Sequence, residues 1–146
     1  MSRSDKVLAG SLLALAAALL LVGVVSGTII RHSVQTVPAL MAFAVALRGN
    51  SWNRTAALPI LALWLLAMVL VWLYLLGLSR MVTGRFTTAE IILTIVIGVS
   101  CMVGLVAAFR TSIRPRLVAG IFSFLLFLGL QIGALWLSVR PAIEHR

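Results

Sequence analysis

The chain alternates between long apolar stretches and short stretches that hold nearly all of its charges. Four of the apolar stretches carry no charged residue and contain 19 to 25 residues each: residues 7–30, 55–79, 91–109 and 117–139. Because an α-helix rises about 1.5 Å per residue, roughly 20 apolar residues cross the ~30 Å hydrocarbon layer of a bilayer. The pattern therefore predicts an all-α integral membrane protein with four transmembrane helices, at about residues 7–30, 56–78, 90–109 and 117–139.

A shorter uncharged segment, residues 32–47, lies between the first and second predicted spans. Its 16 residues would form a helix of only about 24 Å, which favours a re-entrant or interfacial helix over a further span. Thr36 is expected to cap this helix, with Pro38 in the first turn, so the helix is predicted at about residues 37–47. Ala39, Ala42 and Ala46 share one face with Gln35, which permits close contact with another helix.

Composition supports a single membrane domain over residues 1–146. Apolar residues make up 62% of the chain and charged residues only 10%, whereas about a quarter of the residues in a typical soluble domain are charged. The predicted spans and their links use most of the chain, so a separate soluble domain does not fit. Any function is therefore expected within the bilayer or at its surface.

The basic residues lie at or beyond the ends of the predicted spans and give the chain a net charge of +9. Arginine in this position attracts anionic lipid by about 1 kcal/mol per residue, which explains the charge better than nucleic-acid binding does. Guanidinium groups also match the geometry of phosphate oxygens. We therefore expect anionic membrane lipids as partners, no nucleic acid, and headgroup contacts from Arg31, Arg110, Arg114 and Arg116.

The basic residues in the loops leave the membrane orientation open. With four spans, six basic residues lie on each side of the membrane, and this tie permits insertion in both orientations. A fifth span at residues 32–47 would change the count to seven against five, with the N-terminus inside. We expect four spans with both termini cytoplasmic, in the cytoplasmic membrane of a bacterium.

Small residues at four-residue spacing indicate where helices contact one another, because close backbone approach holds helices together in lipid. The candidate packing positions are Gly23, Gly27, Gly98, Gly104, Gly129 and Gly133. In the second predicted span, large side chains recur at the same spacing. This stripe, which we expect to contact a partner or lipid, consists of Trp64, Met68 and Trp72.

Polar residues inside the apolar stretches are few. Gln131 is the only amide within a long predicted span, and an amide facing hydrocarbon without a partner is costly, so we expect it to turn inward. It serves either as a contact between helices or as part of a polar path. The candidate set for that contact or path is Gln131, Gln35, His32, Ser123 and Thr94.

Patterns that would indicate catalysis or a bound metal are missing from the sequence. Cys101 is the only cysteine, and His32 has no second intramembrane histidine with which to hold haem. Glu90, three residues after Thr87, fits a capping box rather than a catalytic carboxylate. We therefore expect no catalytic residue, no metal and no cofactor.

Two functions remain open for a chain of this kind. The first is a non-catalytic subunit or scaffold of a membrane complex, with arginines that bind lipid at its rims, acting as a homo-oligomer or with other membrane subunits. The alternative is a small homo-oligomeric channel or transporter with a polar path near Gln131. A membrane enzyme acting on lipid headgroups is a more distant third, because only His32 could serve as its base.

Overall fold

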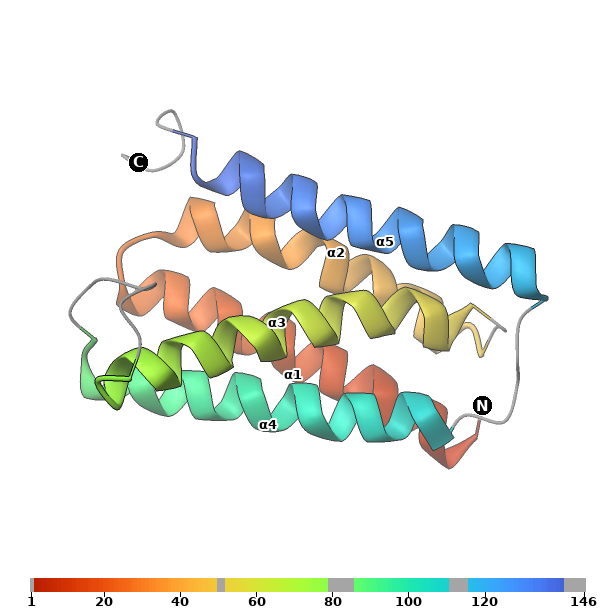
Figure 1. Cartoon of the computed structure of the whole chain (residues 1–146), viewed down its shortest axis with the longest axis horizontal. Helices are drawn as coiled ribbons and strands as arrows, with labels where there is room; N and C mark the ends of the chain where they lie inside the picture. Colours follow the sequence, from red (N-terminus) through yellow and green to blue (C-terminus); the bar gives the residue numbers. More distant parts are fainter. Residues whose placement is uncertain (1, 50–51, 79–85, 111–115, 141–146) are drawn as a thin grey trace.

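The computed structural model describes residues 2–49, 52–78, 86–110 and 116–140, and the described part is all-helical. Its five helices lie side by side along the long axis of the molecule (Figure 1). Each of the five is long and apolar enough to cross a membrane. The helices are α1 (Arg3–Val25), α2 (Ile29–Leu47), α3 (Asn53–Leu75), α4 (Thr88–Arg110) and α5 (Leu117–Ser138).

Each helix runs antiparallel to the one before it, so the described ends of the chain lie at opposite ends of the bundle (Figure 1). Helix α1 packs mainly against α2 and α4, and α3 packs against α4, α5 and α2. Helix α5 lies at the edge, where it contacts only α2 and α3 among the described helices. Any side chain of α5 that is fully buried therefore faces α2 and α3.

Helix α1 begins and ends with local signals in the sequence. Ser2 and Asp5 form a capping box, in which the Asp5 amide donates to Ser2 Oγ at 3.1 Å and the Ser2 amide donates to Asp5 Oδ2 at 2.8 Å. At the other end Gly27 takes a φ of +68°, and the Thr28 amide donates to the Gly23 carbonyl at 2.8 Å. This left-handed glycine turn ends the helix. The predicted span at 7–30 is therefore wrong at its C-terminal end.

Helix α2 differs most from the sequence prediction. It begins at Ile29 rather than near Val37 and contains 19 residues, which corresponds to about 28 Å. Thr36 is not an N-cap, because its hydroxyl lies inside the helix and donates to the His32 carbonyl at 2.7 Å. Pro38 also falls inside the helix. The predicted short helix at 37–47 is too short, and an architecture of four spans plus a re-entrant helix is not confirmed.

The core of the bundle lies around α1. Leu8, Leu12, Leu15 and Leu19 recur at three- and four-residue spacing and are at most 1% exposed. The small face predicted for α2 is buried as well, through Ala39, Ala42 and Ala46, each 0% exposed. These alanines allow the neighbouring backbones to approach closely, which increases the dispersion contacts that hold helices together in lipid.

Three of the six predicted packing glycines lie at close helix contacts. A Cβ at Gly23 would lie 2.8 Å from His32 Cβ and 3.0 Å from Ile29 Cα, and one at Gly104 would lie 2.9 Å from Leu61 Cδ1. Gly98 lies directly against the Trp72 ring. Gly27 instead forms the turn described above. A Cβ added at Gly129 or at Gly133 would meet no atom within 4 Å, so both glycines face open space.

We predict that Gly23→Ala lowers the apparent melting temperature of the purified protein in detergent. Its methyl group would collide with the α2 backbone at Ile29, and overpacking of this kind costs about 1–3 kcal/mol. Gly10→Ala is the matched control, because Gly10 lies in the same helix with no atom within 4 Å of the added carbon. A melting temperature of Gly23→Ala equal to that of Gly10→Ala would contradict the close contact of α1 with α2.

Candidate functional site

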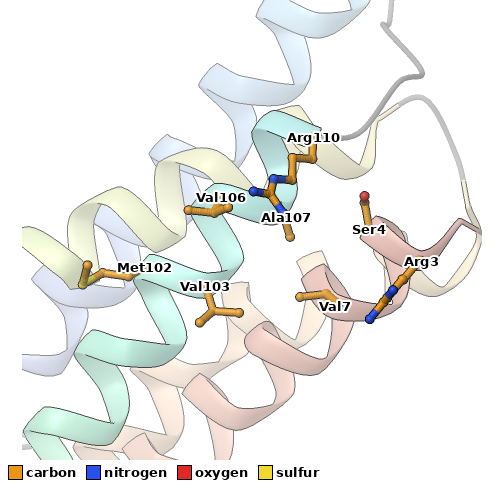
Figure 2. Close-up of a pocket in the computed structure, with 8 residues that line it drawn as sticks. All are labelled: Arg3, Ser4, Val7, Met102, Val103, Val106, Ala107 and Arg110. Carbon is orange, nitrogen blue, oxygen red and sulfur yellow. The ribbon is translucent and has the colours of Figure 1, made fainter.

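A groove of about 610 Å³ lies between the start of α1 and the end of α4. Figure 2 shows Arg3, Ser4 and Val7 projecting from α1, opposite a row of residues from α4. The α4 side of the groove consists of Met102, Val103, Val106, Ala107 and Arg110. The groove thus combines polar side chains at one end of the bundle with an apolar wall that extends along α4.

Helix packing brings the two arginines to the same groove. Arg3 is the first residue of α1 and Arg110 is the last residue of α4. Because these two helices pack against each other with opposite directions, the start of one lies beside the end of the other. Arg110 is predicted from the sequence as a headgroup ligand, whereas Arg3 is not. Only the pairing of α1 with α4, which the sequence pattern does not reveal, places Arg3 there.

The chemistry of this groove matches an amphipathic anion. Both arginines are exposed, so their guanidinium groups are free to meet a ligand from the surface. Arginine binds phosphate through parallel N–H donors and stays charged at any physiological pH. Val103 and Val106 are 46% and 51% exposed, respectively, and leave apolar surface beside these charges. The arginines match the phosphate of a lipid, and the apolar wall of α4 matches an acyl chain of the same lipid.

A neighbouring cation and anion at the same end are already engaged. The Arg54 guanidinium lies 5.2 Å from the centre of the Phe109 ring, which ties the start of α3 to the end of α4. Asp5 is 2% exposed, and its Oδ2 accepts the Ser2 amide. Neither residue lines the groove.

The other predicted headgroup arginines do not join this groove. Arg116 is exposed at the start of α5, at the same end of the bundle. Arg31 lies at the opposite end in the first turn of α2, and its buried Nε has no hydrogen-bond partner among the described residues. Arg114 lies outside the described residues. The four predicted ligands therefore do not form one site.

Two members of the predicted polar set, Gln35 and His32, form hydrogen bonds in the first two turns of α2, at the end of the bundle opposite the groove. Gln35 is 5% exposed, and its Nε2 donates to Ser138 Oγ of α5 at 2.8 Å. His32 Nδ1 lies 3.0 Å from Thr28 Oγ1, one turn earlier in the chain. Gln35 thus connects two helices, while His32 makes a local contact in the first turn of α2.

Thr94 lies at another interface, between α3 and α4. Its hydroxyl accepts from Trp72 Nε1 at 3.1 Å and lies 2.8 Å from the Ile91 carbonyl. Trp72 therefore packs within the bundle, against Gly98 and Thr94. Trp64 and Met68 are 7% and 6% exposed, so this stripe lies largely inside the core and not on a face available to lipid or to a partner.

Gln131 and Ser123 turn inward from α5, as expected of polar residues in hydrocarbon. Both are 0% exposed. Neither the two polar atoms of the Gln131 amide nor Ser123 Oγ has a hydrogen-bond partner among the described residues. The polar set is thus divided between two interfaces. Gln131 and Ser123 of α5 and Gln35 of α2 lie where α5 packs against its neighbours, whereas Thr94 lies between α3 and α4.

The described residues contain no group of three or more histidine, cysteine or acidic side chains that could hold a metal ion. Cys101 is buried. In the groove lined by Arg3 and Arg110, two arginines and an apolar wall together indicate a ligand.

Comparison of the chain with protein-family models, with curated proteins and with solved structures found no match.

Proposed function

We propose that the protein is a non-catalytic integral membrane scaffold or subunit that binds an anionic phospholipid in the groove between α1 and α4. The observation that carries this proposal is the placement of Arg3 and Arg110 at one end of an apolar groove. A headgroup phosphate between the two guanidinium groups would leave an acyl chain to run along Val103 and Met102. A zwitterionic lipid would gain less, because it carries no net charge for the arginines to attract.

We predict that Arg3→Gln combined with Arg110→Gln weakens retention of phosphatidylglycerol by roughly ten- to thirty-fold, since each arginine contributes about 1 kcal/mol near an anionic lipid. The measurement is native mass spectrometry of the full-length protein, released from nanodiscs that contain phosphatidylglycerol and phosphatidylcholine.

The matched control is Lys6→Gln combined with Arg48→Gln. It removes the same charge from exposed residues at the same end of the bundle, outside the groove. We expect this control to retain phosphatidylglycerol like the wild type. If both double variants lost phosphatidylglycerol equally, general surface charge would explain its retention and the groove would not be a specific site. Equal retention of the two lipids by the wild type would also contradict the proposal.

We further propose five membrane crossings with the N-terminus in the cytoplasm, in the cytoplasmic membrane of a bacterium. The support is α2, whose 19 residues form a helix alongside the others. With five crossings, seven basic residues lie on the side of the N-terminus (Arg3, Lys6, Arg48, Arg54, Arg110, Arg114, Arg116) and five on the other side (Arg31, Arg80, Arg85, Arg140, Arg146). This excess obeys the positive-inside rule and turns the groove toward the leaflet richer in anionic lipid.

The five-crossing proposal predicts that the two termini lie on opposite sides of the membrane. Single cysteines at Ser2 and at His145, in a Cys101→Ala background, are tested with a membrane-impermeant maleimide on intact spheroplasts. We expect labelling at position 145 only, and labelling at both positions after lysis. The alternative with four crossings and both termini cytoplasmic requires that neither position reacts before lysis.

The scaffold part of the proposal is supported by the outer face of α5. Gly129 and Gly133 line an apolar groove between α2 and α5 and have open space beside them. Small residues spaced four apart let the backbone of another helix approach closely. A second copy of the chain or another membrane subunit would gain contact area here.

A homo-oligomeric channel or transporter remains the second candidate, favoured by the buried amide of Gln131, which has no hydrogen-bond partner among the described residues. Under this alternative, Gln131→Leu abolishes solute flux in proteoliposomes while assembly stays normal, because the change removes the polar atoms and keeps a similar volume. The measurement is flux of several small neutral solutes, with wild-type vesicles as reference. Unchanged flux in the variant, or no flux in the wild type, would leave the scaffold as the proposed function.

A further inference from the structure

The buried face of α5 is polar for much of its length. Its buried residues are Gly120, Ser123, Phe127, Gln131, Ala134 and Ser138. The three polar members of this set are each 0% exposed. Since α5 contacts only α2 and α3 among the described helices, all three lie along one seam between α5 and those two helices.

The end of this seam near Ser138 is closed by protein hydrogen bonds. Ser138 Oγ accepts from Gln35 Nε2 at 2.8 Å and lies 2.7 Å from the Leu135 carbonyl. The α2–α3 side of the bundle has a similar tie at its opposite end, where Asn53 Nδ2 donates to the Ala46 carbonyl at 3.4 Å. Gln35 and Asn53, near opposite ends of the bundle, thus find partners within the protein.

Gln131 and Ser123 of α5 are different, because their side-chain polar atoms have no partner among the described residues. Gln131 Nε2, Gln131 Oε1 and Ser123 Oγ are all buried without a hydrogen bond to any described residue. Burial of an unpaired amide is strongly unfavourable, and most buried polar groups in proteins bond either to protein or to ordered water. A primary amide has two donor hydrogens and an acceptor oxygen, so it requires a ligand that can both donate and accept.

The surroundings narrow the class of ligand. The stretches of α2, α3 and α5 beside Gln131 contain no charged residue, so a bound ion would be uncompensated in a medium of low dielectric constant. The face that α2 buries is formed largely by small residues, among them Ala39, Ala42 and Ala46. Gln131 itself is fully enclosed. The site therefore suits a small neutral molecule with both hydrogen-bonding functions.

We propose that ordered water molecules bind in the seam between α2, α3 and α5 and hydrogen-bond to the Gln131 amide and the Ser123 hydroxyl. Two residues that lie eight apart in a helix are about 12 Å apart along its axis, so these groups require separate water molecules. Buried waters of this kind typically make about three hydrogen bonds and belong to the structure. Helix α5 is then joined to its neighbours partly through water.

The chain offers a direct test because Gln35 and Gln131 are its only glutamines. Glutamine with a ¹⁵N side-chain amide, introduced by cell-free synthesis, gives one resonance from a paired amide and one from the proposed water site. Solid-state NMR of the full-length protein in phosphatidylglycerol and phosphatidylcholine bilayers then measures magnetisation transfer from water to each amide. Either Gln131→Leu or Gln35→Leu assigns both resonances, so one folded variant is sufficient.

We expect the Gln131 amide to receive water magnetisation at least three-fold faster than the Gln35 amide. Depth alone predicts the opposite order, since Gln35 lies in the second turn of α2 and Gln131 lies seven residues before the Ser138 end of α5. Transfer to Gln131 that is equal to or slower than transfer to Gln35 would overturn the proposal. The result does not depend on lipid retention at Arg3 and Arg110, so the two proposals can fail separately.

Discussion

Hydrocarbon supplies no hydrogen-bond partner, so each polar group in a membrane helix must find one inside the protein or be left with a large desolvation cost. The five helices meet this requirement for their backbones by intrahelical bonds. Some polar side chains meet it by pairing across helices, as Gln35 does with Ser138 and Trp72 does with Thr94. This constraint explains why the buried hydroxyl and amide groups lie on the inner faces, while the outer faces are formed by valine, leucine, isoleucine and phenylalanine.

In hydrocarbon the hydrophobic effect does not drive apolar side chains together. Helices associate instead through the van der Waals contacts of closely packed surfaces. Gly23 lets the start of α2 lie against the end of α1, and Gly98 accommodates the Trp72 ring. These contacts fix the α1–α2 and α3–α4 pairs, and the pairing of α1 with α4 in turn places Arg3 and Arg110 in one groove. The candidate lipid site is thus a product of helix packing, since α1 and α4 each supply only one wall of the groove.

Sequence alone determined the class of protein, because runs of about 20 uncharged residues can be satisfied only by helices in a bilayer. It also located α3, α4 and α5 closely, since charged residues mark their ends, and it predicted the inward turn of Gln131. It did not locate the boundary between α1 and α2, because the turn at Gly27 contains no charge and the helix resumes two residues later. It misjudged α2, because Thr36 and Pro38 are typical of helix starts yet are tolerated inside this packed helix.

Only the tertiary structure decided which helices are neighbours, and with it the groove at Arg3, the burial of Trp64 and Met68, and the division of the polar residues between two interfaces. The physical reason is that spans of similar length and hydropathy carry little information about their partners. Pairing depends on the shapes of small and large side chains at facing positions, which arise only when helices far apart in sequence come together.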